Sequence, residues 1–293
     1  MNGALIVDKP AGLTSHDVVN RVRRIAGTRR VGHLGTLDPA ATGVLPLLLD
    51  RATRLAQFLM RADKLYDATI RFGYATSTYD REGEPLGAQQ DVQVDPSWLE
   101  DIVPQFLGRI QQIPPAISAK KISGVPAYKL ARQQKPVELE PVEVEIYSIQ
   151  IVSVEGALAR IKVHCSAGTY LRTLAHDLGR ALGCGAHLYE LRRLASGPFS
   201  IDQARTLEEL GELAKEGRLT EAIVPAAELL PDLPYEIVDR TTVAFIRQGR
   251  DFRVSPFHSR SGARYVKAVG PDGELVAIGE ARLPNVYHPI VVL

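Results

Sequence analysis

The chain has 293 residues, of which 45% are hydrophobic and 24% charged, a balance that excludes a disordered or fibrous protein and a length that suits two domains or one large domain with an appendage. No apolar run approaches the roughly 20 residues of a membrane span, and the N-terminus lacks a basic flank with a long apolar core, so we expect no membrane segment and no secretory signal. The formal net charge of +1 selects no class of partner, and two cysteines exclude a disulfide framework, which fits a reducing cytoplasm.

The first part of the chain is predicted to alternate strands and helices. A short buried strand is expected at residues 4–8, where Lys-Pro-Ala-Gly ends it. A helix follows that Ser15 caps and Gly27 closes, because the apolar residues between them recur at helical spacing. A second helical stretch is predicted at 51–60. Apolar and polar residues then alternate over 66–72, which is typical of a half-buried strand.

The middle of the chain holds the longest irregular segments. Residues 74–95 are rich in Gly and Asp and are expected to form a loop. A helix is predicted at 96–108, and the proline inside it leaves its end undefined. Residues 111–136 form a polar segment with four prolines, and a loop of that length is either functional or disordered. Clean alternation predicts two strands, 142–151 and 158–165.

The last part is predicted to contain two helices and then a small β-rich unit. An amphipathic helix at 169–183 ends in a glycine, and Thr206 forms a capping box with Glu209 at the start of a short acidic helix. Two prolines within 230–235 mark the preferred domain boundary. Beyond it we expect a short helix at 240–250, a hairpin with a Pro-Asp-Gly turn at 264–281 and a closing strand at 286–293. Together these elements predict a mixed α+β body of about 230 residues with a small β-rich tail domain.

The stretch GHLGTLDPAATGVL, residues 32–45, holds a carboxylate on a tight loop. Its glycines permit sharp turns, and Pro39 restricts the backbone beside Asp38. Asp before Pro also starts many ordinary turns, so a purely structural reading stays open. Arg172, near the start of a predicted helix, is the partner that a buried carboxylate would need, and it would favour the ionised form. The sequence alone does not bring the two residues together.

Charge is unevenly distributed along the chain. Residues 1–54 carry a net charge of +4, whereas 200–235 carry −5. Five arginines and no acid lie within 21–30, with Arg29 and Arg30 at the end of this run. Such a cluster is either a solvated helix face or a patch that contacts phosphates, because guanidinium groups match phosphate oxygens. The polarised charge keeps nucleic-acid binding open.

Three aromatic side chains are candidates for substrate contact. His33 lies on the same loop as Asp38; a lone histidine is usually structural, but one beside a reactive carboxylate can orient or stack on a substrate. Tyr66 begins a strand and Tyr170 lies two residues before Arg172. Both are core aromatics by default, although tyrosines also stack on bases in RNA sites.

Metal and cofactor motifs are weak. Cys184 and His187 supply only two ligands at a metal-like spacing, and no matching pair completes them with Cys165. No GxGxxG follows a strand and no P-loop is present, and no Ser-His-Asp pattern is visible. We therefore expect neither a metal nor an organic cofactor.

Five motifs in order resemble the TruB family of tRNA pseudouridine synthases, which isomerise the uridine at position 55 in the T loop. VDKPAGLTS (7–15) and GHLGTLDPAATGVLP (32–46) resemble the family's first two motifs, and DKLYDATIRFG (63–73) carries its tyrosine. IPPAISAKKISGVPAYKLAR (113–132) is similar to an insertion of the bacterial members. VHCSAGTYLRTLAHDLGRALGCGAHLYELRRLASGPF (163–199) resembles the arginine motif and its sequel. The resemblance covers nearly the whole chain.

The resemblance implies roles for the matching positions. Asp38 falls on the essential aspartate and Arg172 on the arginine that pairs with it. Tyr66 falls on the tyrosine that stacks on the target base and is proposed to remove its C5 proton. Six positions are expected to serve substrate binding: His33, Tyr170, Leu191, Lys9, Arg29 and Arg30. His33 would lie beside the flipped nucleotide, and Tyr170 and Leu191 would line the uridine pocket. Lys9 belongs with Pro10 to a motif that is thought to support the catalytic loop. Leu34 stands where the family often has threonine, which leaves these residues untouched.

The resemblance also implies a fold and a substrate. We expect an α+β pseudouridine synthase fold whose mixed, largely antiparallel central sheet is flanked by helices. The catalytic domain would cover 1–230, with the insertion at about 113–136, and a PUA-like RNA-binding domain would cover 231–293. The T stem-loop of tRNA would reach Asp38, and the acceptor end of the tRNA would reach the tail domain. We expect no cofactor, no obligatory protein partner and a monomer.

The chemistry implied is isomerisation of a base that has left its stack. The enzyme breaks the glycosidic bond, retains the uracil, turns it and rejoins it through C5. The carboxylate would either attack C1′ or remove a sugar proton, and the sequence does not separate these routes. Two alternatives stay open: a guide-RNA-dependent synthase of the dyskerin type, which the insertion at 113–132 disfavours, and a tRNA-folding chaperone or RNA-binding module.

Overall fold

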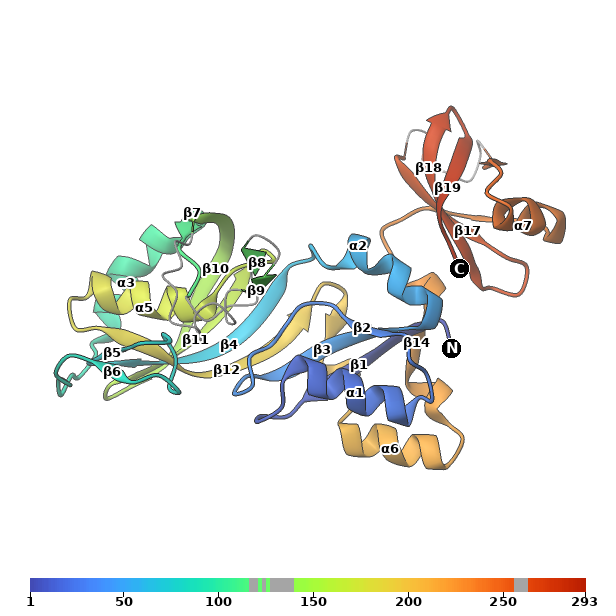
Figure 1. Cartoon of the computed structure of the whole chain (residues 1–293). Helices are drawn as coiled ribbons and strands as arrows, with labels where there is room; N and C mark the ends of the chain where they lie inside the picture. The colour runs from blue at the N-terminus through green and yellow to red at the C-terminus, as the bar shows by residue number, and fades with distance from the viewer. Residues whose placement is uncertain (116–120, 123–124, 127–139, 256–262) are drawn as a thin grey trace.

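The computed structural model describes residues 1–115, 121–122, 125–126, 140–255 and 263–293. Most of the predicted insertion at 113–136 therefore lies outside the described residues. The described parts form a large sheet with helices on it and a smaller sheet near the C-terminus (Figure 1). In the described ranges no helix is long and apolar enough to cross a membrane.

The large sheet has ten strands and carries the candidate site. Its main path runs through β14 (Ile223–Pro225), β1 (Gly3–Lys9), β3 (Thr42–Leu49), β12 (Ala186–Ser196), β4 (Lys64–Phe72), β11 (Leu158–Cys165), β10 (Val142–Glu155) and β7 (Gly108–Gln112), with β2 (Val31–His33) beside β3 and β13 (Phe199–Ser200) beside β12. Neighbouring strands are antiparallel except for the parallel pair β3 and β12. The predicted mixed, largely antiparallel sheet is confirmed.

Strand β4 shows how sequence pattern positions the site. Its residues alternate between buried and half-buried, so Tyr66 lies on the core face while Asp67 lies on the opposite one. Helix α5 (Leu171–Ala181) packs its apolar side onto β12 and β4, and its first turn carries Arg172. This packing brings the predicted strand and the predicted helix to one face of the sheet.

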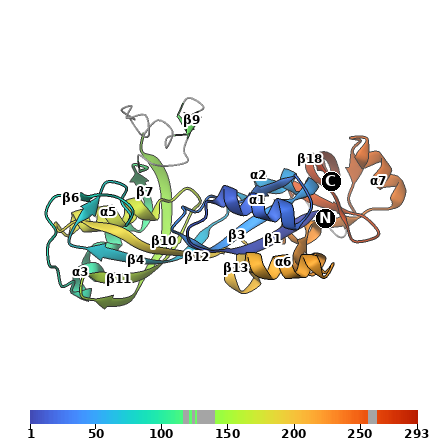
Figure 2. The same cartoon turned by 60° about the horizontal axis from the view of Figure 1, so that its bottom comes forward.

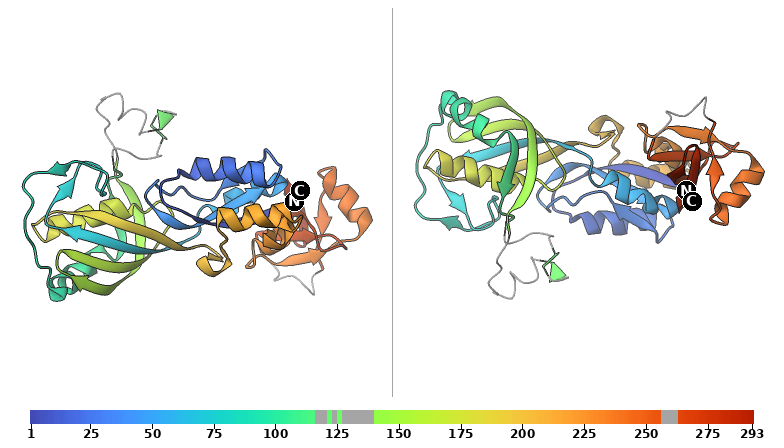
Figure 3. Two further views of the ribbon diagram at one scale, coloured as in Figure 1. Left: turned by 90° about the horizontal axis from the view of Figure 1, so that it is seen from below. Right: turned by 90° about the horizontal axis from the view of Figure 1, so that it is seen from above.

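The helices complete the body. They are α1 (Ser15–Ile25), α2 (Ala56–Leu59), α3 (Pro96–Ile102), α5 and α6 (Leu207–Lys215), with 3-10 segments η1 (Asp50–Leu55), η2 (Val103–Phe106), η3 (Ile201–Gln203), η4 (Leu219–Ala222) and η5 (Ala226–Glu228). Figures 2 and 3 show three parts in succession along the molecule: the half with α3 and α5, the half with α1 and α6, and the C-terminal sheet. Two small ladders are separate from the strand order of both sheets: β5 (Ala75–Thr76) with β6 (Pro85–Leu86), and β8 (Lys121–Ile122) with β9 (Val125–Pro126).

Two helical predictions need correction. The cap of α1 is Thr14, which forms a capping box with Asp17, whereas Ser15 is the first helical residue. The stretch predicted as one helix at 51–60 is a 3-10 segment followed by the single turn of α2. The closure of α1 at Gly27 is confirmed by its left-handed φ of 61°. The undefined end at 96–108 is resolved because α3 stops at Ile102, just before the 3-10 turn that holds the proline.

The C-terminal sheet has five strands in the order β15 (Tyr235–Ile237), β17 (Tyr265–Val269), β18 (Leu275–Leu283), β19 (Val286–Val292) and β16 (Phe252–Arg253), with α7 (Arg240–Arg247) beside it. The predicted hairpin is present, and Gly273 closes its turn by donating to the carbonyl of Gly270 at 3.0 Å. Apolar residues of this sheet share one buried cluster with β1, β3 and α2. The two parts are also joined by an edge contact of Phe58 with Tyr265, ring centroids 5.4 Å apart.

Candidate active site

The loop between β2 and β3 presents Asp38. Its tight shape depends on glycine at Gly43, whose φ is 97° and where a Cβ would lie 2.2 Å from the carbonyl oxygen of Arg193. Ala41 donates to the carbonyl of Asp38 at 3.1 Å, which closes a turn over Pro39. The turn is an ordinary one, and it places the carboxylate at the surface of a cavity.

Arg172 and Asp38 meet, although 134 residues separate them. Arg172 Nε lies 3.0 Å from Asp38 Oδ2, and Nη2 donates to Oδ1 at 3.4 Å. The third nitrogen, Nη1, lies 3.4 Å from Asp80 Oδ2 and 3.4 Å from the carbonyl oxygen of Thr78. One buried guanidinium therefore holds two carboxylates, and its planar fork fixes the orientation of Asp38.

The pKa of Asp38 is raised above its ordinary value. Withdrawal from solvent is the largest cause, the Arg172 guanidinium opposes it, and Asp80 adds to the rise. The guanidinium does favour the ionised form, but burial has the larger effect. The side chain of Asp38 nevertheless remains 43% exposed, so it is accessible to a substrate.

The side chains of Lys9 and Ser15 hold the backbone of the Asp38 loop through hydrogen bonds. Lys9 is fully buried, and its ammonium donates to the carbonyl oxygens of Pro10, Pro39 and Ala41 at 2.8, 3.1 and 2.6 Å. Burial lowers the pKa of Lys9 to about 8, and the charge of Asp38 opposes this shift. We therefore assign Lys9 to loop support and not to RNA contact.

Ser15, expected as a helix cap, instead binds the catalytic loop. Its hydroxyl donates to the carbonyl of Leu37 at 3.0 Å and accepts from the Leu37 N–H at 2.9 Å. The start of α1 is therefore joined directly to the residue before Asp38. Because Thr14 caps the helix, the serine is available for this contact.

Tyr66 and Arg193 are cross-strand neighbours on β4 and β12, and both are buried. Burial raises the pKa of the Tyr66 phenol, while the charge and hydrogen bond of Arg193 oppose the rise. Arg193 also donates to the carbonyls of Val44 and Gly35 at 2.7 and 3.1 Å. It therefore joins the tyrosine to the catalytic loop and favours loss of the phenolic proton.

A cavity of about 310 Å³ lies between the loop, β4, β12 and the start of α5. Five of the candidates line it: Asp38, Tyr66, Tyr170, Arg172 and Leu191. Gln112 holds the Tyr170 peptide, accepting from its N–H at 2.9 Å and donating to its carbonyl at 3.3 Å. The structure thus brings together the Asp38 carboxylate, its arginine, two aromatic side chains and two further cations, Lys64 and Arg193.

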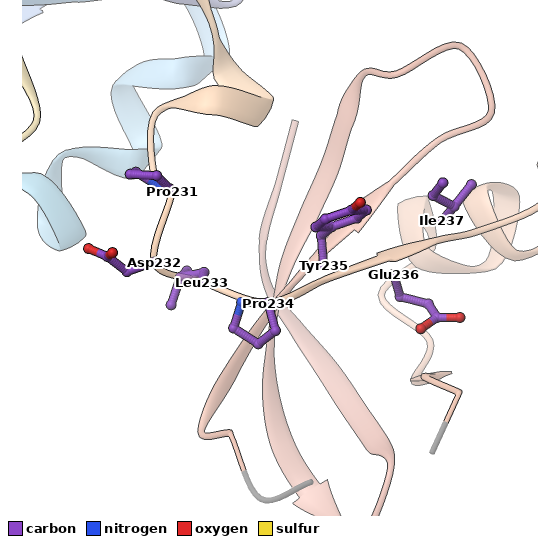
Figure 4. Close-up of a pocket in the computed structure, with 7 residues that line it drawn as sticks. All are labelled: Pro231, Asp232, Leu233, Pro234, Tyr235, Glu236 and Ile237. Atoms are coloured by element: carbon purple, nitrogen blue, oxygen red, sulfur yellow. The ribbon is translucent and has the colours of Figure 1, made fainter. Parts of the chain in front are cut away.

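A larger hollow lies elsewhere. It measures about 680 Å³ and is lined by residues 231–237, where the chain passes into the C-terminal sheet (Figure 4). None of the candidate residues lies on it, and its lining contains two carboxylates but no cation. We therefore take the candidate site from its paired charged groups and not from the size of the hollow.

His33, Arg29 and Arg30 lie outside the cavity lining. His33 is half-buried at the end of β2, and burial lowers its pKa. Its Nδ1 has no hydrogen-bond partner among the described residues. Arg29 and Arg30 are exposed in the segment between α1 and β2. All three residues lie in the stretch of chain between α1 and the loop that carries Asp38.

Across the described ranges, no group of three or more His, Cys, Asp or Glu side chains is arranged to hold a metal ion. His187 is buried, and its Nδ1 lies 3.1 Å from the carbonyl oxygen of Tyr74. Both cysteines are free, Cys165 in the core and Cys184 half-buried.

Comparison with known proteins identifies the family. One family model, the N-terminal domain of the TruB family pseudouridylate synthases, matches residues 23–171, and a second, the C-terminal domain of tRNA pseudouridylate synthase B, matches 172–231. The chain is 59% identical to the tRNA pseudouridine synthase B of Solibacter usitatus (strain Ellin6076) over 293 residues, which covers all of both proteins. The chain belongs to the TruB family.

Other members and one solved structure extend this relation. The tRNA pseudouridine synthase B of Geotalea uraniireducens (strain Rf4) is 43% identical over 289 residues, covering 97% of this chain and 93% of that one. A Cbf5–Nop10–Gar1 complex contains a chain with 30% identity and a TM-score of 0.73, covering 98% of this chain and 83% of that one. The expected pseudouridine synthase fold is confirmed.

Within the TruB family pattern, the departure at Leu34 has a structural reason. Leu34 is buried in the apolar cluster that β1 and β3 share with the C-terminal sheet. Its N–H donates to the carbonyl of Pro46 at 2.9 Å. The leucine therefore adds apolar contact on the side of the loop that faces away from Asp38.

Three residues of the site were missed in the sequence, namely Asp80, Arg193 and Lys64. Asp80 lies in a polar loop where acids are common, and Arg193 follows another arginine in a strand. A signal was present for Arg193, because a charged residue in phase with the apolar positions of a strand points into the core. Lys64 shows the same phase, since it precedes Tyr66 by two residues on β4.

Proposed function

We propose that this protein isomerises the uridine at position 55 in the T loop of tRNA to pseudouridine. The observation that carries the proposal is the two-point contact of Arg172 with Asp38 at a cavity that Tyr66 also lines. Membership of the TruB family and the names of the full-length relatives support it. The residue roles read from the family pattern are part of this proposal.

Each site residue has a different role in breaking and remaking the glycosidic bond. Asp38 acts on the ribose, either by forming a bond to C1′ or by removing the proton on C2′. Arg172 orients the carboxylate, and closure of the RNA over the loop dries the site and strengthens this contact. Tyr66 stacks on the base and takes the C5 proton, helped by the cation of Arg193 beside its oxygen.

The target base must leave its stack to reach Asp38. Extrusion costs a few kcal/mol, which stacking on aromatic side chains and phosphate contacts offset. Tyr66 and Tyr170 supply aromatic faces in the cavity. His33, at the entrance to the loop, is placed to contact the RNA beside the flipped nucleotide.

The RNA would lie across the basic N-terminal region. Arg29 and Arg30 are exposed and precede the catalytic loop, whereas the segment 200–235 carries a net charge of −5. We assign residues 1–230 to the catalytic domain, with the insertion at about 113–136, and 231–293 to a PUA-like domain that contacts the acceptor end. We further propose a cytoplasmic monomer without an obligatory protein partner or cofactor.

The direct test is incubation of the purified protein with unmodified tRNA transcript, followed by mapping of pseudouridine at single-nucleotide resolution. We expect modification at position 55 without added protein or guide RNA. The likeness to a chain of the Cbf5–Nop10–Gar1 complex gives the alternative, a guide-dependent synthase. Activity that appears only when a guide RNA is added would support that alternative. Binding without modification in either case would support an RNA chaperone.

The RNA path has its own test. Each phosphate contact contributes to the salt dependence of binding, so replacing Arg29 and Arg30 with alanine should lower the slope of log Kd against log salt by roughly 1.5. Single-turnover chemistry at saturating tRNA should change little. Lys215 and Arg218 form the control pair, because both are exposed in the acidic segment. A slope that changes only in the control pair would place the RNA on another face.

A further inference from the structure

Among the described residues, two cations of the cavity have no carboxylate within ion-pair distance. The lining includes four charged groups, of which Asp38 and Arg172 form an ion pair. Arg193 donates to the carbonyls of Val44 and Gly35, and the ammonium of Lys64 donates to the carbonyl of Ala62 at 2.7 Å. Among the described residues neither forms an ion pair within 4 Å.

Lys64 lines the cavity together with the loop that carries Asp38. It is only 5% exposed, and a Cβ built at Gly35 would lie 3.8 Å from Lys64 Cε and 3.6 Å from Arg193 Nη1. Lys64 precedes Tyr66 by two residues on the same face of β4. The ammonium is therefore on the side of the cavity where the base would stack, and not on the exposed rim where the RNA backbone would pass.

The groups around Lys64 do not balance its charge. The neighbouring carboxylate, Asp63, lies 3.3 Å from His164 Nε2 and accepts from the Tyr147 hydroxyl at 3.3 Å. Cys165 lies opposite Lys64 on β11. Burial lowers the pKa of Lys64 to about 8, Arg193 lowers it further, and Asp63 and Cys165 oppose the shift. A buried ammonium without an anion is costly to fold, and such groups cluster at functional sites.

The proposed reaction creates an anion at this place. When the N1–C1′ bond breaks, the electron pair remains on N1, and the negative charge spreads over the ring nitrogen and the carbonyl oxygens of uracil. C1′ gains a bond to an Asp38 oxygen, or C2′ gives its proton to Asp38 and a C1′–C2′ double bond forms. After the uracil turns, C5 bonds to C1′ while the Asp38–C1′ bond breaks or, in the second route, while C2′ takes its proton back from Asp38. The C5 proton then leaves to Tyr66, and N1 takes up a proton.

We propose that Lys64 stabilises the negative charge on the detached uracil, an inference that rests on the proposed function. A preformed cation in a dry site lowers the energy of a charge that develops only as the bond breaks. The interaction is absent from bound uridine, which is neutral. It therefore accelerates the chemical step without tightening the binding of tRNA.

The test compares Lys64→Met with the wild-type protein on two tRNA substrates, one with uridine and one with 5-fluorouridine. Fluorine withdraws electron density and stabilises the uracil anion, so its cleavage needs less help. We expect about a 100-fold slower single-turnover rate on uridine, in the range of losing one group that stabilises an oxyanion. The loss on 5-fluorouridine, followed as consumption of that nucleoside, should be several-fold smaller.

Two variants control for charge and fold. Lys162→Met removes a lysine on β11 that lies opposite Asp67, on the other face of the sheet, and should leave both rates unchanged. Lys64→Arg keeps the cation and should recover part of the rate; it also tests the proposal if Lys64→Met does not fold.

Equal losses on both substrates would indicate a structural role and overturn the proposal. An effect confined to Kd and its salt dependence would indicate a phosphate contact and overturn it as well. Absence of pseudouridine with the wild-type protein would refute the proposed function itself.

Discussion

Replacing Arg172 with lysine separates the charge of this residue from its shape. Three guanidinium nitrogens are engaged: Nε and Nη2 with Asp38, and Nη1 with Asp80. The side chain is 8% exposed, so water cannot replace these contacts. Lysine keeps the positive charge but offers a single nitrogen on a flexible stem, and it cannot hold both oxygens of Asp38 in one plane.

The expected loss follows from these contacts. A hydrogen bond to a charged group contributes about 1.5–3 kcal/mol, and lysine would lose at least one of the two to Asp38 together with the contact to Asp80. Taking a net loss of about 3 kcal/mol in the transition state, the rate should fall roughly 100-fold. Binding of tRNA should change little, because Arg172 is buried behind Asp38.

The assay is single-turnover pseudouridine formation at saturating tRNA, with the Kd and the thermal unfolding of each variant measured in parallel. Arg160→Lys is the matched control, because Arg160 makes the same two-point contact with Asp67 at 2.8 and 2.7 Å. That pair lies on the opposite face of the sheet with Arg160 53% exposed, where ion pairs contribute about 0–1 kcal/mol. A rate for Arg172→Lys within threefold of the wild type would show that the two-point contact does not position Asp38.

Three further predictions concern the catalytic loop. Asp38→Asn should abolish isomerisation while tRNA binding survives, since the amide is neither a nucleophile nor a base at neutral pH; measurable pseudouridine from a verified variant would refute the assignment. Because the pKa of Asp38 is raised and the ionised form is required, the single-turnover rate should fall on the acid side with a midpoint above about 4, the ordinary value for aspartate; a midpoint below that value would contradict the effect of burial. Lys9→Met should lower the free energy of unfolding in urea by about 2–4 kcal/mol, because buried carbonyls lose their donor, and should slow catalysis more than it weakens tRNA binding; an unchanged unfolding curve would mean that the loop does not depend on Lys9.

Several elements with a local cause were predicted correctly from the sequence, although the cap of α1 was assigned one residue too late. The closing glycine of α1, the capping box of α6 and the turn of the β17–β18 hairpin each depend on residues within one or two turns of the chain. The alternation of β4 is also local, and it already places Tyr66 on the core face. The five motifs and their order along the chain were sufficient to predict the family. These signals are visible because short-range sterics and hydrogen bonds act between neighbours in the sequence.

The order of the strands in the large sheet determines which side chains meet at the candidate site. Strand β12 lies between β3 and β4, parallel to one and antiparallel to the other, and no local pattern states that order. It places Arg193 within hydrogen-bond distance of the Gly35 carbonyl, 158 residues away. The same arrangement brings Asp80 to Arg172 and leaves Lys64 buried without an ion-pair partner among the residues that the structure describes. A strand specifies only which of its side chains face the core. What those side chains meet there depends on long-range packing, which only the tertiary structure determines.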